Sequence, residues 1–289
     1  MKVKVIECPR DAMQGLHSFI PTELKTRYIN QLLQVGFDTL DFGSFVSPKA
    51  IPQLRDTAEV LKGLNMSKTQ TKLLAIIANQ RGGDEAVVFD EITYLGFPFS
   101  ISETFQQRNT HSSIAQSFAT VEGLQNSCVR NNKQLVVYIS MAFGNPYGDE
   151  WNADIAIQHI KKIAALGVKT ISLADTVGIA TPEDITYLFS QVIPEFDTIE
   201  IGAHLHCTAA NRELKIDAAF KAGCRRFDTA IKGYGGCPMA NDDLVGNLAT
   251  EYLLNYLQQH DAETGVDLSK FAASLNEADN VFNYTQLEH

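Results

Sequence analysis

The sequence lacks several features that would place it in a specialised class of protein. No stretch approaches the roughly 18 consecutive apolar residues of a membrane-spanning helix, and no charged start followed by an apolar run suggests a secretory signal peptide. The five cysteines are odd in number and irregularly spaced, which indicates reduced thiols in a cytoplasmic protein. Excess basic charge is also missing: the formal net charge of −10 argues against nucleic acid or an anionic membrane as partner.

The remaining composition is that of an ordinary globular chain. Apolar residues make up 45% and charged residues 20% of the 289 positions, which is enough for a full hydrophobic core. No linker, low-complexity segment or change in composition divides the chain, which favours one domain. The Gly-x-Gly-x-x-Gly turn that often follows the first strand of a doubly wound nucleotide-binding sheet is missing as well.

Short β-branched runs alternate with amphipathic segments of helical length along the chain. Eight runs are predicted to be strands, at residues 2–7, 37–45, 72–79, 91–97, 134–143, 169–175, 199–206 and 225–231. Helices are predicted at residues 21–34, 51–64, 83–88, 111–132, 152–166, 213–221 and 242–259. A further helix is predicted to begin at about residue 181, and another to lie in the tail, over residues 267–287. Eight strand–helix repeats predict an α/β fold, a TIM (β/α)8 barrel with a short extra C-terminal segment. We interpret residues 1–286 as this single domain and residues 287–289 as the remnant of an expression tag.

Metal-ligating residue types stand at the ends of three predicted strands. Asp11 follows the first strand, His204 and His206 end the seventh, and Asn247 follows the eighth. Residues two apart on a strand face the same side, and the carboxyl ends of barrel strands meet at one mouth. A carboxylate, two imidazoles and an amide carbonyl suit an octahedral Mg²⁺ or Mn²⁺ better than a tetrahedral Zn²⁺. Taken singly, each has a simpler alternative: an ion pair or helix cap for Asp11, a helix position for Asn247, and a histidine pair without a ligand.

Motifs spread from residue 5 to about residue 257 carry a family resemblance. They are Glu7-x-Pro9-Arg10-Asp11-x-x-Gln14, Ser44-Phe45-Val46-Ser47-Pro48-Lys49, Ser102-Glu103-Thr104-Phe105, Tyr138-Ile139-Ser140, Ser172-Leu173-x-Asp175-Thr176-Val177-Gly178, His204-x-His206, and Gly235-Gly236-Cys237-Pro238 followed by Gly246-Asn247-Leu248-Ala249-Thr250-Glu251. The chain resembles the 3-hydroxy-3-methylglutaryl-CoA lyases, which belong to a metal-dependent barrel superfamily together with isopropylmalate synthase and 4-hydroxy-2-oxovalerate aldolase. The Gly-Gly-Cys-Pro loop is the motif that singles out the lyases.

This resemblance implies an acyl-CoA substrate, which the enzyme cleaves to acetyl-CoA and acetoacetate. It implies that Asp11, His204, His206 and Asn247 hold a divalent cation, Mg²⁺ or Mn²⁺, which would chelate the substrate and lower the pKa of its 3-hydroxyl group. Some relatives dimerise, so the resemblance also allows a homodimer, although no sequence feature fixes it.

Three residues have catalytic roles by the same resemblance. Arg10 would stabilise the negative charge that develops on the thioester oxygen of the enolate. Cys237 would exchange a proton with the enolate carbon. His204 would also handle the hydroxyl proton, although a metal-bound imidazole is a poor base. Further residues are predicted to contact the substrate: Gln14, Asp41, Lys49, Tyr138, Asp175 and Thr176.

The chain departs from the family pattern at several positions. Asp41 replaces a glutamate, Cys207 replaces the aspartate after the second histidine, and Val136 replaces an arginine expected on the fifth strand. The segment from Cys237 to Asn247 is one residue longer than in the animal enzymes. These changes leave the metal and proton-transfer groups in place but remove a cation suited to an anionic substrate.

Two other functions remain open on sequence grounds. One is a Claisen-type synthase or aldolase of the same superfamily, which would condense acetyl-CoA with a 2-oxo acid; such relatives usually carry a regulatory domain beyond the barrel. The other is a barrel that keeps its metal but serves as a binding protein. Retention of the whole set of predicted ligands and catalytic groups favours an enzyme.

Overall fold

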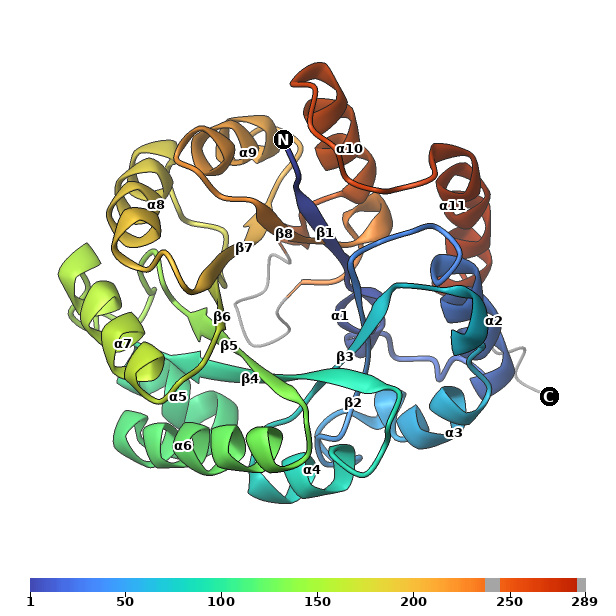
Figure 1. Ribbon diagram of the computed structural model, residues 1–289, viewed down its shortest axis with the longest axis horizontal. Helices are drawn as coiled ribbons and strands as arrows, with labels where there is room; N and C mark the ends of the chain where they lie inside the picture. The colour runs from blue at the N-terminus through green and yellow to red at the C-terminus, as the bar shows by residue number, and fades with distance from the viewer. Residues whose placement is uncertain (237–244, 285–289) are drawn as a thin grey trace.

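The computed structural model describes residues 1–236 and 245–284, and its centre is a closed barrel of parallel strands (Figure 1). The barrel strands are β1 (Lys4–Glu7), β2 (Thr39–Ser44), β3 (Lys72–Ile76), β4 (Ile92–Ser100), β5 (Gln134–Ser140), β6 (Thr170–Asp175), β7 (Glu200–Cys207) and β8 (Arg226–Thr229). Each strand pairs with the next in chain order, and β8 pairs with β1 to close the ring. The predicted TIM barrel is confirmed; the predicted tag remnant, 287–289, lies outside the described residues.

Helices surround the barrel (Figure 1). They are α1 (Pro9–Gln14), α2 (Thr22–Leu32), α3 (Thr57–Lys62), α4 (Gln80–Ala86), α5 (Glu103–Thr110), α6 (Ile114–Arg130), α7 (Ala153–Ala165), α8 (Pro182–Glu195), α9 (Arg212–Lys221), α10 (Thr250–Gln259) and α11 (Leu268–Phe282), with 3-10 turns η1 (Pro52–Leu54), η2 (Met66–Lys68) and η3 (Ile231–Gly233). Two of the longest helices, α6 and α8, begin with capping boxes at Ser113 and Thr181. The extra C-terminal segment is α11, which lies against α2 (Figure 1). Among the helices of the described residues, none is long and apolar enough to cross a bilayer.

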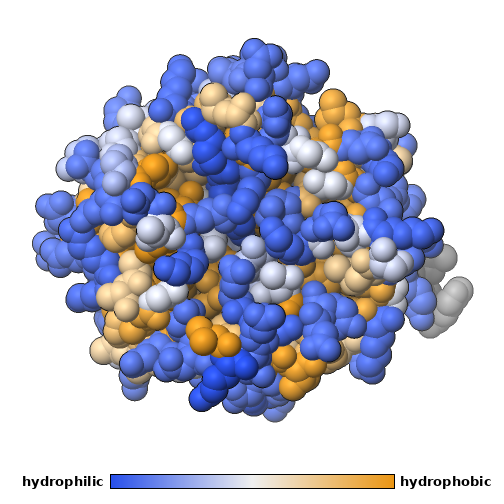
Figure 2. Space-filling model, in the orientation of Figure 1, coloured by the Kyte–Doolittle hydropathy of each residue, from blue (hydrophilic) through white to orange (hydrophobic). Residues whose placement is uncertain are grey.

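The visible face of the molecule is mostly hydrophilic, and its apolar residues form small, separate patches (Figure 2). This face therefore offers no broad apolar surface of the kind that stable subunit interfaces use. The homodimer stays a prediction.

Apolar side chains fill two regions of the protein. The larger region lies between the barrel and its helices. The smaller one occupies the barrel interior beside β3, β4 and β5, and its buried members are Leu74, Ile76, Tyr94, Val136 and Tyr138. Val136 is thus part of an apolar cluster at the position where the resemblance led us to expect an arginine. Polar interior side chains gather on the opposite side of the barrel, on β6, β7 and β8.

Two predicted helices differ from the structure in extent. The segment 51–64 splits into η1 and α3, and at the break the carbonyl of Gln53 accepts a hydrogen bond from the side chain of Lys25. The helix predicted at 111–132 begins at Ile114, and α5 precedes it as a separate helix. His111 ends α5 in a left-handed conformation, with φ of 54°.

The helix predicted at 242–259 begins only at Thr250, and residues 242–244 lie outside the described residues. Before it, Gly246 and Asn247 form a short strand, β9, which pairs antiparallel with β7 and places Asn247 opposite His206. The backbone of Gly246 passes so close to η3 that a Cβ atom there would lie 2.7 Å from the carbonyl oxygen of Gly233. Asn247 is therefore a strand residue, in contrast to the helix position considered from the sequence.

Glu7, the last residue of β1, joins this strand to η3 and α10. Its side chain is 1% exposed, and Oε1 accepts a hydrogen bond of 2.8 Å from the backbone N–H of Ile231. Oε2 accepts one of 2.6 Å from the hydroxyl of Thr250 at the start of α10. Burial raises the pKa of Glu7 to about 8, although these hydrogen bonds oppose the change. The carboxyl group is therefore protonated in the folded protein at neutral pH.

This raised pKa predicts how the stability of the protein changes with pH. Between the ordinary pKa of 4.5 and the folded value of about 8, the folded state holds a proton that the unfolded state has lost. The free energy of unfolding therefore falls as pH rises through this window, by about 1.4 kcal/mol per pH unit for one group. In Glu7→Gln this contribution is absent, so urea denaturation midpoints should decline less between about pH 5 and pH 8. Glu183→Gln, an exposed control on α8, should keep the wild-type slope; an equally steep slope in Glu7→Gln would contradict the prediction.

Candidate active site

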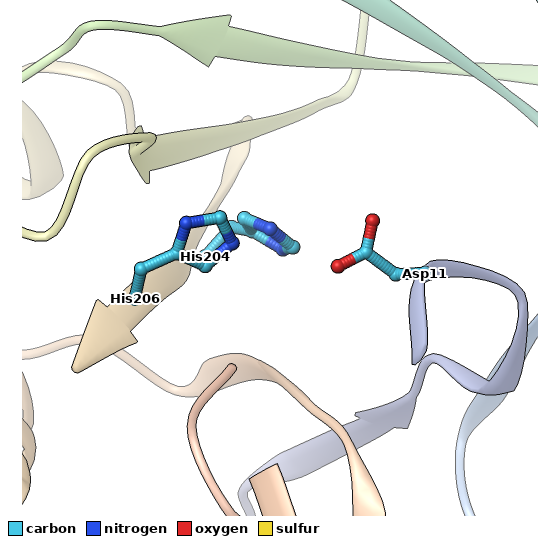
Figure 3. A group of neighbouring side chains, drawn as sticks. All are labelled: Asp11, His204 and His206. Atoms are coloured by element: carbon cyan, nitrogen blue, oxygen red, sulfur yellow. The ribbon is translucent and has the colours of Figure 1, made fainter. Parts of the chain in front are cut away.

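Three metal-ligating side chains meet at the C-terminal mouth of the barrel (Figure 3). Asp11 lies on α1, directly after β1, and His204 and His206 lie on β7. One ligand atom of each lies within 4.8 Å of the others. The carboxylate of Asp11 points toward the two imidazoles from across the mouth (Figure 3). The structure thus brings together the three residues that strand periodicity and strand order predicted to converge.

Asn247 lies beside this group, because β9 holds it against β7. Its amide nitrogen donates hydrogen bonds to Asp11 Oδ2, at 2.7 Å, and to the carbonyl of Tyr234, at 2.9 Å. These contacts occupy the nitrogen, so Oδ1 is the atom that can bind a cation. The side chain is 5% exposed, and it is close enough to Asp11 to complete a four-residue site.

Each imidazole is held by its Nδ1 atom. Nδ1 of His206 is 2.9 Å from the carbonyl oxygen of Thr176, and Nδ1 of His204 is 3.3 Å from Asp228 Oδ2. Partners of this kind fix the tautomer of a metal-binding histidine and leave Nε2 for the ion. Nε2 of His206 is buried and has no hydrogen-bond partner in the described part of the chain. A buried nitrogen left free beside a carboxylate fits a divalent cation.

The electrostatics of Asp11 and His206 agree with cation binding. For His204, burial lowers the pKa but the hydrogen bond and charge of Asp228 outweigh it, so the pKa of this imidazole is raised. Burial raises the pKa of the Asp11 carboxyl, but Arg10, the two imidazoles and the hydrogen bond from Asn247 outweigh it and bring the pKa to about 2. Burial also lowers the pKa of His206, and the neighbouring His204 adds to this effect. An ionised carboxylate and a neutral imidazole are the protonation states that bind metal ions.

Arg10 lies next to Asp11 and is held by three side chains. Its guanidinium donates to the carboxylate of Asp41 through Nε and Nη2, over 2.5–3.2 Å, and through Nη1 to Asp11 at 2.9 Å and to Gln14 at 2.8 Å. Asp41, although shorter than the expected glutamate, therefore reaches Arg10. The negative partners raise the pKa of Arg10 against the effect of burial, so the group stays charged. Gln14 also donates to Asp11 Oδ1, at 2.8 Å.

A cavity of about 360 Å³ opens onto the metal-ligating group. The predicted site residues that line it are Arg10, Asp11, Gln14, Tyr138, Thr176, His204 and His206. Helix α5 contributes residues that were not predicted, namely Phe105, Arg108, Asn109, Thr110 and His111. The sequence pointed to this region through the Ser-Glu-Thr-Phe motif, but no helix was predicted over Glu103–Thr110.

Three other residues of interest, Asp175, Lys215 and Lys49, do not line this cavity. The carboxylate of Asp175 binds the buried Lys215, at 2.5 Å, and accepts a hydrogen bond from the N–H of Ala180, at 3.1 Å. Asp175 is not among the residues that line the cavity, and its contact with substrate stays a prediction. Lys215 in turn donates to the carbonyl of His206. Lys49 is exposed and does not line the cavity either. Cys237 lies outside the described residues.

Cys207 shows how the chain accommodates a departure from the family pattern. The side chain is 6% exposed, and burial raises the pKa of its thiol to about 11. The position therefore supplies a neutral thiol where the resemblance led us to expect an aspartate.

A closed (β/α)8 barrel with a candidate divalent-metal centre at its C-terminal mouth defines the class of the protein. Residues 3–277 match the model of the HMGL-like family, and the chain belongs to that family. It is 33% identical over 271 residues to the cytoplasmic 3-hydroxy-3-methylglutaryl-CoA lyase of Rattus norvegicus, covering 93% of this chain and 78% of the rat protein. It is 32% identical over 269 residues to hydroxymethylglutaryl-CoA lyase of Bacillus subtilis, covering 92% and 88% of the two chains.

Solved structures agree with this assignment. The structure of an HMG-CoA lyase from Acinetobacter baumannii in complex with coenzyme A and 3-methylmalate superposes with a TM-score of 0.90 at 31% identity, covering 99% of this chain and 94% of that one. The HMG-CoA lyase of Bacillus subtilis gives a TM-score of 0.91 at 30% identity, covering 100% and 96%. The family resemblance drawn from the motifs is confirmed.

Proposed function

We propose that the protein is a metal-dependent carbon–carbon lyase that cleaves a 3-hydroxy-3-methylglutaryl-CoA-type thioester. The observation that carries the proposal is the convergence of Asp11, His204 and His206 beside the buried, charged Arg10, in a chain of the HMGL-like family. The reaction removes the proton of the 3-hydroxyl group, breaks the C2–C3 bond, and yields acetoacetate and the enolate of acetyl-CoA, which then takes a proton at carbon.

Asp11, His204, His206 and, through Oδ1, Asn247 would hold the divalent cation. When bound, Mg²⁺ or Mn²⁺ lowers the pKa of the substrate hydroxyl and orients the bond that breaks. The four residues come from α1, β7 and β9, which are all anchored to the barrel, so the ligands are held before the substrate arrives.

Arg10 supplies the positive charge for the developing enolate. The guanidinium lines the cavity, and Asp41, Asp11 and Gln14 fix its orientation, so no reorganisation is needed as negative charge develops on the thioester oxygen. Proton transfer to the enolate carbon is assigned to Cys237. Gly235 supports this assignment, because its backbone passes so close to Asp11 that a Cβ atom there would lie 2.7 Å from the Asp11 carbonyl oxygen. Gly235 is two residues before Cys237 in the sequence.

The anionic part of an acyl-CoA substrate requires cationic or hydrogen-bonding groups outside the metal centre. Arg108 and His111 are exposed and line the same cavity from α5, so we assign them this role together with Asn109. Tyr138 and Thr176 line its inner part and contact the acyl group in this proposal. A cytoplasmic location agrees with the reduced cysteines and with a CoA thioester as substrate.

A coupled assay for acetyl-CoA release from HMG-CoA tests the function directly. Protein stripped of metal should be inactive, and Mn²⁺ or Mg²⁺ should restore turnover by at least about a hundredfold. Turnover that a chelator leaves unchanged would refute the metal-dependent mechanism. Thiol release from acetyl-CoA with 2-oxo acids, in the absence of HMG-CoA cleavage, would identify a Claisen-type synthase instead.

A further inference from the structure

A second group of charged side chains lies inside the barrel, on the side of the metal centre that faces the N-terminal ends of the strands. Asp228 and Arg226 are two residues apart on β8, so their side chains share the face that points into the barrel. Asp228 is 2% exposed and Arg226 is fully buried. A buried charge is costly unless an opposite charge or hydrogen bonds compensate it, so the two residues require each other or further partners.

Asp228 connects this group to the metal centre. Its Oδ2 is 3.3 Å from Nδ1 of His204 and accepts a hydrogen bond of 3.2 Å from the hydroxyl of Ser172. The other oxygen, Oδ1, is buried and has no hydrogen-bond partner among the described residues. A carboxylate at Nδ1 fixes the tautomer of a histidine and the direction of its Nε2 lone pair. The position of Asp228 therefore determines how His204 faces the cation.

Arg226 crosses the interior of the barrel beside this carboxylate. Its Cδ atom passes over Gly202 of β7, where a Cβ atom would lie only 2.9 Å away, so the glycine makes room for the side chain. Gly202 shares a rung of the barrel with Ser172 and Tyr138, which places Arg226 in the layer that supports Asp228. Tyr138, the member of this rung on β5, belongs to the apolar cluster of the barrel interior.

The hydrogen-bonding groups of Arg226 are largely free. Nη1 is 3.5 Å from Oε2 of Glu200, which is paired with Lys4 as well. Nε and Nη2 are buried without a partner in residues 1–236 and 245–284, and so is the hydroxyl of Tyr138. Burial opposes the charge of Arg226, but Asp228 is the first of the acidic groups that keep its pKa above the ordinary value. Buried donors on Arg226 and the buried acceptor Oδ1 of Asp228 thus lack partners among the described residues. Internal water molecules commonly bridge buried polar groups of this kind.

We propose that Arg226 is a positioning residue for the metal centre: it compensates the charge of Asp228 inside the barrel and so holds Asp228 against Nδ1 of His204. The inference rests on the proposed metal centre and extends it by two residues into the barrel interior. Arg226 does not line the substrate cavity, so it acts through Asp228 and not on the substrate.

Titration of metal-free protein with Mn²⁺ in a calorimeter tests the inference. Arg226→Met should weaken Mn²⁺ binding by about 10- to 100-fold, the usual cost of losing support for a metal-binding histidine. Arg226→Lys keeps the charge and should restore the affinity to within about 3-fold of wild type, which a purely space-filling role would not predict. Glu200→Gln, the matched control, neutralises the other partner of Arg226, together with the ion pair to Lys4, and should leave Mn²⁺ affinity unchanged.

A double-mutant cycle separates positioning from general stability. In the Asp228→Asn background, Arg226→Met should cost little further affinity, because the residue through which it acts has been neutralised. This charge-balanced double variant also carries the test if Arg226→Met alone does not fold. Wild-type affinity in folded Arg226→Met, or a further loss in the double variant relative to Asp228→Asn, overturns the inference. Failure of the wild type to bind Mn²⁺, or unchanged binding in His206→Ala, overturns the proposed metal centre itself.

Discussion

Replacing His206 with alanine is expected to abolish detectable Mn²⁺ binding and to lower HMG-CoA turnover by at least about a thousandfold. Nε2 of His206 is buried, has no partner in the described part of the chain, and lies in the group formed with Asp11 and His204. The alanine variant keeps the strand but leaves a cation with one ligand fewer. The Lewis-acid stabilisation of the transition state amounts to several kcal/mol, and about 4 kcal/mol corresponds to a thousandfold in rate.

Calorimetry with Mn²⁺ and the coupled assay would measure the two effects on the same preparation. Thermal unfolding of the metal-free variant should show that the barrel is intact, because among residues 1–236 and 245–284 the lost imidazole makes one hydrogen bond, to the carbonyl of Thr176. His17→Ala, at an exposed position after α1, is the control and should match the wild type in both assays. A His206→Ala variant that binds Mn²⁺ as tightly as the wild type would show that the cation lies elsewhere.

Arg10→Lys is expected to lower kcat by about 10²- to 10³-fold, although it keeps the positive charge. The guanidinium binds Asp41 with two nitrogens and Asp11 and Gln14 with a third, so its orientation toward the cavity is fixed. A lysine ammonium is a point charge on a flexible chain and cannot satisfy these acceptors from one position. Loss of one preorganised donor to a developing oxyanion costs a factor of this size.

The change should fall on kcat, while Mn²⁺ affinity stays within about 3-fold of wild type. Asp11 has a pKa of about 2 in the folded protein, so it remains ionised near neutral pH after one of its favourable partners has changed. Arg27→Lys, an exposed position on α2 paired with Glu277, is the matched control and should leave both quantities unchanged. Turnover of Arg10→Lys within threefold of wild type would remove Arg10 from the mechanism, and a loss confined to metal binding would make it a support for Asp11 alone.

The sequence predicted the barrel and most of its site because both depend on local rules. Period-two alternation places His204 and His206 on one face of a strand whatever the surroundings, and parallel strands in a barrel must end at the same mouth. Knowing only that Asp11 follows the first strand was therefore enough to expect it near the histidines.

The parts that the sequence did not predict depend on contacts between distant segments. Asn247 lies on β9 because its backbone pairs with β7, a contact that helical periodicity around it does not encode. Asp175 looks like a cavity residue at the end of its strand, yet Lys215, 40 residues further on, binds its carboxylate. The position of Arg226 inside the barrel likewise depends on the pairing of β8 with β7, which lies between distant segments of the chain.

The pairing of β9 with β7 has a consequence for how such proteins can diverge. Gly235 is pressed against the backbone at Asp11, and Asn247 is held in register with His206, so the two points that bound the Cys237 segment are both anchored to the barrel. A residue can be gained or lost between these anchors without moving Asn247. If the proposed mechanism holds, the residues of the metal centre and the proton-transfer residue Cys237 are therefore separate units of evolutionary change.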